Sequence, residues 1–279
     1  VQYIITLDSD TQLLYGTAGQ MIGAMAHPLN RPQVDRERKT VVDGYGVLGV
    51  NIDVGIQEAG ATGFSRLLCQ NPGIHSYHFA QSDVYQDVFG RGSFTGKGIF
   101  DIDVYLEVLE GRFPKNRILS HDLLEGCVLG AGKLEDVTLL DGVPHTFKSY
   151  LSREHRWIRG DVQLLPYLLP KVANEQGKRE KNPVGKLGRF KILENILRCF
   201  YPPVCLLCLI IGCLLANRTG VGFLLLGLSY NFFGPLIHLV RLIASAIGNG
   251  LFGFDFWGDG ISLLKVWKNA ATHFLFLPS

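Results

Sequence analysis

The feature that most constrains this chain is a pair of apolar runs in its last third. Residues 200–216 supply about seventeen positions without a charge, which is close to the lower limit for a membrane-spanning helix. After a short polar break, a second apolar run covers residues 221–247 and is interrupted by His238 and Arg241. We therefore predict a two-helix transmembrane hairpin over residues 199–248. The alternative is a pair of helices buried in the core of a soluble protein.

The charges around these runs predict an orientation. Lys and Arg cluster between residues 171 and 191, within a polar segment that we interpret as a basic juxtamembrane linker over residues 176–198. Because basic residues accumulate on the cytoplasmic side of a membrane, the part of the chain before this linker is predicted to be cytoplasmic. Residues 249–279 mix aromatic and charged side chains, which favours an interfacial amphipathic segment followed by the start of a further span.

Composition excludes several classes of function. The net charge of the 279 residues is only +2, so we expect no nucleic-acid partner. Among the six cysteines, Cys205 and Cys208 have metal-site spacing but lie inside the first apolar run, so we expect neither a zinc site nor a disulfide framework. The chain starts directly on a strand pattern, and we expect it to be a piece of a longer protein.

The first 175 residues have a different pattern. Short β-branched and aromatic runs alternate there with segments of helical periodicity, which predicts an α/β domain over residues 1–175. The predicted strands cover residues 3–7, 45–52 and 136–140, and the predicted helices cover residues 11–25, 56–68, 102–109, 123–129 and 152–165.

Two aspartates follow the first predicted strand directly. Asp8 and Asp10 are one residue apart at its carboxyl end, which is where open α/β sheets bind their ligands. Mg²⁺ and Mn²⁺ prefer carboxylate oxygens and bridge them to phosphate oxygens. The pair thus predicts a Mg²⁺ or Mn²⁺ site that carries a nucleotide diphosphate. The alternative is a strand-to-helix turn in which Asp10 caps the helix.

Two later segments carry other groups that sugar transfer from a nucleotide sugar requires, namely a base, cations for the diphosphate and an aromatic face for a sugar ring. Asp122 follows His121 at the start of a predicted helix and offers a base, although it could also serve only as a helix cap. The segment REHRWIRGD places Arg156 and Arg159 on one helical face beside Trp157. Its alternative is a solvated basic helix with the tryptophan in the core.

Five stretches of the sequence, taken together, point to one protein family: TLDSDTQL, MAHPLNRP, SDVYQDVFGRGSFTGKGIFDID, RFPKNRILSHDLLEG and HRWIRGD. They resemble the glycosyltransferase domain of cyclic β-1,2-glucan synthases, which is related to processive family-2-like glycosyltransferases such as cellulose synthase. The resemblance covers residues 1–161. It implies a GT-A-like (Rossmann-like) fold, UDP-glucose as the donor, Mg²⁺ or Mn²⁺ as the cofactor, a growing glucan as the acceptor and inversion at the anomeric carbon.

The resemblance also assigns roles by position. Asp8 and Asp10 match the metal and diphosphate carboxylates, and Asp122 matches the base of the Thr-Glu-Asp motif of cellulose synthases. Arg156 and Trp157 match the end of Gln-x-x-Arg-Trp, with an arginine in place of the glutamine. The expected substrate-binding residues are Arg153, Arg156, Trp157, Arg159, Gly96 and Lys97.

The resulting expectation is a multi-pass enzyme of the bacterial inner (plasma) membrane, with its catalytic domain in the cytoplasm. It would transfer glucose from UDP-glucose to a growing β-1,2-glucan chain. One alternative is another processive synthase that makes a cellulose-, chitin- or hyaluronan-like polymer. The other is a non-catalytic membrane component that only binds a nucleotide sugar, and Asp122 together with Arg156 and Trp157 argues against it.

Overall fold

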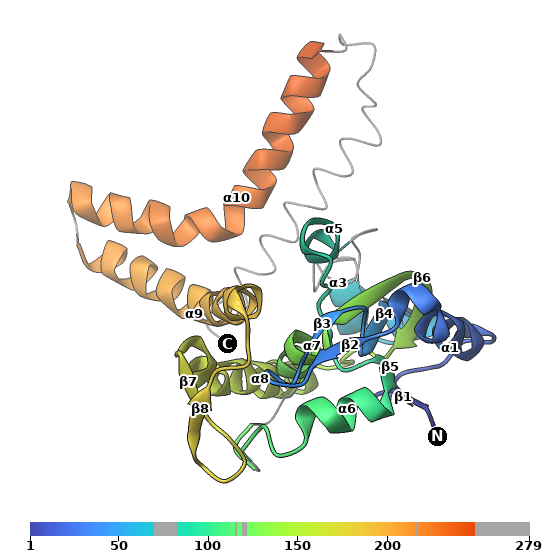
Figure 1. Ribbon diagram of the computed structural model, residues 1–279. Coiled ribbons are helices and arrows are strands. Elements are labelled where there is room, and N and C mark those ends of the chain that lie inside the picture. Colours follow the sequence, from blue (N-terminus) through green and yellow to red (C-terminus); the bar gives the residue numbers. More distant parts are fainter. Residues whose placement is uncertain (70–82, 115, 119–121, 216, 249–279) are drawn as a thin grey trace. The chain divides into compact units, whose positions relative to one another are not determined.

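The computed structural model describes residues 1–69, 83–114, 116–118, 122–215 and 217–248 (Figure 1). The chain divides into two compact units, residues 1–196 and residues 197–279, and each is described by itself. The amphipathic segment predicted at residues 249–279 lies outside the described residues, as does His121.

The first unit is built on a four-stranded sheet with the strand order β1-β5-β4-β6 (Figure 1). Strand β5 (Gly98–Asp101) is antiparallel to β1 (Tyr3–Thr6) and to β4 (Val47–Val54), whereas β4 is parallel to β6 (Ala131–Asp141). The carboxyl ends of β1, β4 and β6 and the amino end of β5 therefore share one edge of the sheet. The predicted α/β class is confirmed, and the sheet is compatible with a Rossmann-like fold.

Other elements surround the sheet. The helices of this unit are α1 (Thr17–Ala26), α2 (Ile56–Gly60), α3 (Gly63–Cys69), α5 (Val84–Phe89), α6 (Ile102–Leu109), α7 (Asp122–Leu129) and α8 (Phe147–Gln163), with short 3₁₀ turns η1 (Pro28–Asn30) and η2 (Leu165–Leu168). Two small hairpins pair β2 (Gln33–Asp35) with β3 (Thr40–Asp43) and β7 (Lys171–Ala173) with β8 (Arg179–Lys181). The helix predicted at residues 102–109 is confirmed.

The sheet is covered on both faces. On one face Met21 and Met25 of α1 pack in a fully buried cluster with residues such as Leu48 and Ile99 of the sheet. On the other face, Phe100 and its neighbours pack against α6 and α7 in a second cluster. Consecutive strand residues point to opposite faces, which is why Ile99 and Phe100 belong to different clusters. This burial fixes the strands whose ends build the candidate site.

The chain after Asp10 does not form the helix predicted from residue 11. Gln12 instead pairs with Leu140 of β6 through two backbone hydrogen bonds of 2.7 and 3.2 Å. Gly16, with a φ of 83°, then turns the chain into α1, which begins only at Thr17. Asp10 is therefore not a helix cap, and the alternative interpretation of this aspartate is wrong.

The basic segment at residues 176–198, interpreted as a linker, is folded. It contains β8 and the first turns of α9 (Lys186–Leu214), where Ile192 and Ile196 are buried in a third cluster with side chains from α7, η2 and β7. The ammonium of Lys191 donates hydrogen bonds to the backbone carbonyls of Gly92 (2.8 Å) and Arg91 (3.3 Å). Ile192 and Ile196 are four residues apart and give this basic segment a buried helical face. The segment therefore packs against the α/β unit and is not an extended linker.

The second unit contains the rest of α9 and the helix α10 (Arg218–Gly248). Glycines let the two helices approach closely: a Cβ at Gly212 would lie 2.7 Å from Cγ of Leu224, and one at Gly227 would lie 2.8 Å from Cγ of Leu209. Within the described part of the chain, one helix, α9, is long and apolar enough to cross a membrane. The two-span transmembrane hairpin stays a prediction.

Candidate functional site at the carboxyl edge of the sheet

Residues from three distant parts of the chain meet at the sheet edge where β1 and β6 end. Asp8 and Asp10 follow β1, Asp141 is the last residue of β6, and Lys97 immediately precedes β5. The Lys97 ammonium lies between two of the acids, with Nζ 2.9 Å from Oδ2 of Asp8 and 2.8 Å from Oδ2 of Asp141. The sheet topology thus joins residues that are about 90 and about 40 positions apart into one charged cluster.

The members of this cluster differ in exposure. The side chains of Lys97 and Asp141 are only 11% and 14% exposed, whereas that of Asp8 is 60% exposed. Burial alone would lower the pKa of Lys97, but the hydrogen bonds and charges of Asp141 and Asp8 outweigh it and hold that pKa above its ordinary value. Lys97 therefore remains an ammonium, and of its two partners Asp8 is the one that a ligand from solvent can reach.

Asp141 also holds the turn that carries the first two aspartates. The hydroxyl of Thr11 donates to Oδ1 of Asp141 at 2.7 Å, next to the backbone pairing of Gln12 with Leu140. Sequence analysis missed Asp141 as a site residue. The signal was present, because Asp141 directly follows the predicted strand at residues 136–140 just as Asp8 follows the first strand.

Gly96 brings the predicted base against the same loop. Its φ is 90°, and a Cβ at this position would lie 2.8 Å from Oδ2 of Asp122. The backbone carbonyl of Gly96 accepts a hydrogen bond of 3.1 Å from the Thr6 hydroxyl at the end of β1. Both the positive φ and the close approach of Asp122 require a glycine at this position. Asp122 is the first residue of α7, where the helix N-terminus favours a carboxylate.

A second acid, Glu125, lies one helical turn after Asp122. Burial, followed by the negative charge of Asp122, raises the pKa of Glu125 from 4.5 to about 7, although a long hydrogen bond of 3.5 Å from the Tyr105 hydroxyl acts in the opposite direction. The first turn of α7 therefore carries two carboxyl groups, and Glu125 keeps its proton to a higher pH than an ordinary glutamate does.

Asp10 connects the acidic turn to α8. A Cβ at Gly142 would lie 2.9 Å from Oδ2 of Asp10, so the aspartate packs directly on this glycine. The carbonyl of Gly142 accepts a hydrogen bond of 3.2 Å from Nη1 of Arg153, whose guanidinium lies over the Trp157 ring at 4.5 Å from its centroid. The arginine that replaces the glutamine of the motif therefore joins the tryptophan to the loop beside Asp10.

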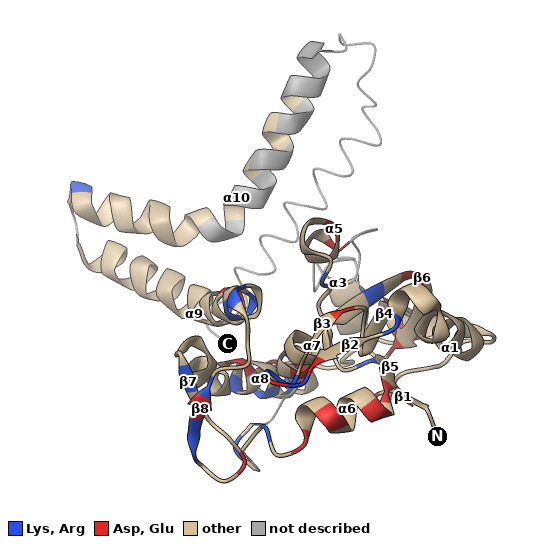
Figure 2. Ribbon diagram, in the orientation of Figure 1, with Lys and Arg blue, Asp and Glu red and all other residues tan. Residues whose placement is uncertain are grey.

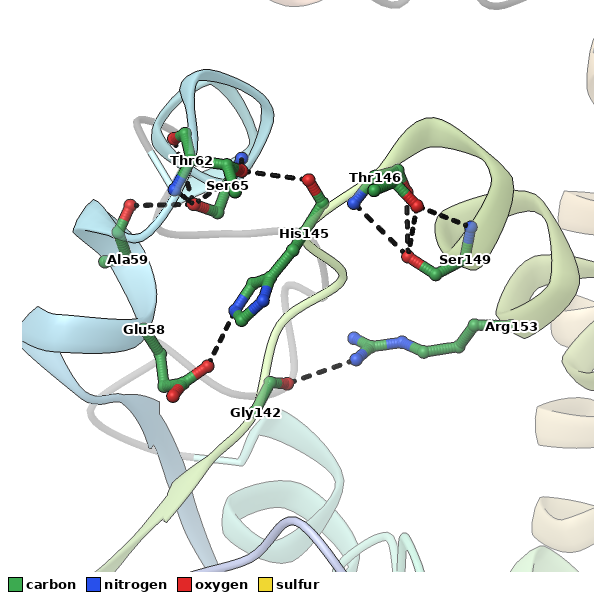
Figure 3. A network of polar contacts seen from close by, with 9 residues as sticks. All are labelled: Glu58, Ala59, Thr62, Ser65, Gly142, His145, Thr146, Ser149 and Arg153. Atoms are coloured by element: carbon green, nitrogen blue, oxygen red, sulfur yellow. Dashed lines mark hydrogen bonds and ion pairs between the residues drawn. The ribbon is translucent and has the colours of Figure 1, made fainter.

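A polar network fixes the start of α8 (Figure 3). The side chain of Thr146 accepts a hydrogen bond of 3.2 Å from the backbone N–H of Ser149 and forms a capping box, so α8 begins five residues before the predicted helix at residue 152. The His145 ring contacts Oε2 of Glu58 at 2.9 Å, and the Thr62 hydroxyl donates to the His145 carbonyl at 2.9 Å. The α2–α3 turn thereby supports the loop that positions Arg153.

Seven of the nine predicted site residues fall along this edge. Arg156 and Arg159 do not. Both are exposed on α8, and neither forms a hydrogen bond or an ion pair within the described part of the chain. Figure 2 shows the basic residues of α8 along this helix. The residues that the structure brings together are Asp8, Asp10, Gly96, Lys97, Asp122, Arg153 and Trp157.

The donor atoms suit Mg²⁺ or Mn²⁺ only in combination with a substrate. No cluster of three or more His, Cys, Asp or Glu side chains fit for a metal ion occurs within the described ranges. Asp8 and Asp10 are both exposed, and these cations are often held by one or two carboxylates together with substrate phosphates. The metal site therefore stays a prediction, for which the carboxylates of Asp8 and Asp10 are the oxygen ligands of the expected kind.

Comparison with characterised proteins gives one relative. The chain is 37% identical over 242 residues to the cyclic beta-(1,2)-glucan synthase NdvB of Rhizobium meliloti (strain 1021). The match covers 86% of this chain and 8% of the relative, so the chain is similar to a small part of that protein. No protein-family model matches the chain. The similarity confirms the resemblance found in the five sequence stretches.

Proposed function

Since the chain is a glucan synthase-related segment, we propose that it forms part of a glycosyltransferase that transfers glucose from UDP-glucose to a growing β-1,2-glucan chain. The observation that carries this proposal is the convergence at one sheet edge. The acidic turn, the loop with Gly96 and Lys97, the start of α7 and the Arg153–Trp157 pair are separate in sequence and meet there. They are the groups that the transfer of a sugar from a nucleotide sugar requires.

On the donor side, we assign the diphosphate to the acidic turn. Asp8 and Asp10 would hold a Mg²⁺ or Mn²⁺ ion, which neutralises the charge that develops on the leaving UDP. The Lys97 ammonium, already fixed 2.9 Å from Asp8, lies where it can contact a phosphate oxygen. The exposed Arg156 and Arg159 of α8 can add further positive charge.

On the acceptor side, we assign the base to Asp122. In an inverting displacement the acceptor hydroxyl attacks the anomeric carbon, the bond to UDP breaks, and the hydroxyl proton passes to the base. The N-terminus of α7 favours the ionised form of Asp122, which is the form that a base needs. Trp157, oriented by Arg153, is the aromatic ring that we assign to the acceptor sugar.

We further propose that the protein acts in the bacterial inner membrane, with this site on the cytoplasmic side. Support comes from α9, which is long and apolar enough to cross a bilayer, from the apolar character of α10, and from the basic residues that precede both. The lipid bilayer is then a partner of the second unit.

Linkage analysis of the polymer made by the full-length protein tests this function. Membranes that contain the protein are given UDP-glucose and Mn²⁺, and we expect β-1,2-linked glucose. Asp10→Ala should abolish this synthesis, while Asp136→Ala, at an exposed position of β6, should not. Another linkage would favour a different processive synthase. Absence of both polymer and released UDP would overturn the proposal and favour a component that only binds a nucleotide sugar.

A further inference from the structure

The two ion pairs of Lys97 are unequal. The pair with Asp8 is open to solvent, because that carboxylate is 60% exposed, whereas Asp141 is 14% exposed and also accepts the Thr11 hydroxyl at 2.7 Å. Exposed ion pairs are screened by water and exchange readily, while a buried, hydrogen-bonded pair is lost only at a larger cost. A cation arriving from solvent can therefore take Asp8 from Lys97 without releasing Lys97 from Asp141.

We propose that Asp141 is a positioning residue of the donor site, which keeps Lys97 and the acidic turn in place when a divalent cation takes Asp8 from the ammonium. The proposal rests on the function proposed above. Before the donor binds, Lys97 neutralises Asp8. With the donor present, the cation takes over Asp8, and Lys97 remains held by Asp141 next to the diphosphate.

The charges at the edge agree with this arrangement. Asp8, Asp10 and Asp141 are three carboxylates, and Lys97 supplies one positive charge. One divalent cation brings the positive charge to three, which matches the three acids before the diphosphate is counted. If Asp141 lost its charge, Lys97 would have only Asp8 as a partner. It would then compete with the cation for Asp8 and would lack a fixed position once displaced.

Asp141→Asn in the full-length protein tests this role, since asparagine keeps an oxygen for Thr11 but removes the charge that holds Lys97. We expect the Mn²⁺ concentration for half-maximal binding of UDP, and for half-maximal synthesis, to rise by at least about ten-fold, as the loss of a charge-assisted hydrogen bond predicts. Asp141→Glu should recover most of the loss. Asp136→Asn removes a charge from an exposed position of the same strand and should leave both concentrations unchanged.

Several results would overturn the inference. One is an unchanged Mn²⁺ requirement in Asp141→Asn, even if the maximal rate falls. Another is the same rise in Asp136→Asn, which would point to general loss of negative charge. If neither Asp141 variant yields folded protein, the carboxylate serves the fold and the inference is also overturned. A parent protein that neither binds UDP nor makes polymer instead overturns the proposed function, and this result is seen before any variant is made.

Discussion

Asp122 and Glu125 lie one turn apart on α7, yet their surroundings differ. Asp122 is the first residue of the helix and packs against Gly96, whereas burial and the charge of Asp122 raise the pKa of Glu125 to about 7. Since a buried carboxyl group keeps its proton to higher pH, we expect the two residues to serve different tasks. Two substitutions at the scale of single residues separate these tasks.

The first substitution is Asp122→Asn, which keeps the size and any capping role of the aspartate but cannot accept the acceptor proton. We expect synthesis to fall by about 10²–10⁴-fold, the usual range for loss of a general base. Binding of UDP should stay close to that of the parent protein. The measurement is polymer formation alongside UDP binding in membranes. Synthesis within a few-fold of the parent would reduce Asp122 to a helix-terminal residue, because Asn and Asp cap about equally well.

The second substitution is Glu125→Gln, which tests the raised pKa. The folded protein binds the Glu125 proton more tightly than the unfolded chain does, so this residue costs stability progressively as pH rises from 4.5 to about 7. Glutamine cannot ionise. The variant should therefore match the parent near pH 4 and be more stable above pH 7, by at most about 3 kcal/mol. Thermal unfolding at several pH values checks this, and a constant difference across the range would contradict it.

At the scale of elements, the loop before β5 is the piece that joins the donor and base sides. Gly96 packs against Asp122, and Lys97 forms ion pairs with Asp8 and Asp141. Earlier in the same loop, the backbone carbonyls of Arg91 and Gly92 accept hydrogen bonds from Lys191 of α9. The loop is thus fixed at both ends. Its shape should matter more to activity than the identity of any exposed side chain on it.

Gly96→Ala tests the loop. The added methyl group would lie 2.8 Å from Oδ2 of Asp122, and alanine is strained at a φ of 90°. We expect a loss of stability of about 1–3 kcal/mol and a loss of most synthesis. Gly19→Ala is the matched control, since a Cβ at this helical position meets no atom within 4 Å and should be neutral or slightly stabilising. Equal behaviour of the two variants would show that the loop has room to adapt.

At the scale of the whole molecule, the chain combines an α/β unit with an apolar helical unit. The first turns of α9 are packed into the α/β unit through Ile192 and Ile196, and the same helix continues as the apolar α9 of the second unit.

Cysteine labelling tests the proposed topology of the whole molecule. Arg218 begins α10 beyond the first apolar span, whereas Lys181 lies in β8 of the α/β unit. In intact cells, an impermeant thiol reagent added outside should label Arg218→Cys above the level of the parent protein and should not label Lys181→Cys. The opposite pattern would place the site outside the cytoplasm, and labelling of both or neither would contradict a single span between them.

The local chemistry of the site could be predicted from sequence. The apolar run before Asp8 specifies a strand, so the carboxylates had to fall at a strand end. The helix predicted at residues 102–109 is confirmed with these bounds, and the side chain of Asp101 caps its start. The start of α8 was missed because Thr146 and Ser149 form a capping box without the usual Glu or Gln. Strand β5 was missed because it is only four residues long and directly follows a glycine-rich loop, and its neighbours β1 and β4 supply the pairing.

The sequence alone therefore determined the α/β class, the candidate residues of the acidic turn, the α7 start and α8, and the apolar character of the last third. These features depend on residue propensities and on apolar periodicity, and both can be read within a short window of sequence. Only the tertiary structure decided that Lys97 bridges Asp8 and Asp141. That contact depends on the order and register of β1, β5, β4 and β6. Register is set by burial on both faces of the sheet, which no single segment encodes.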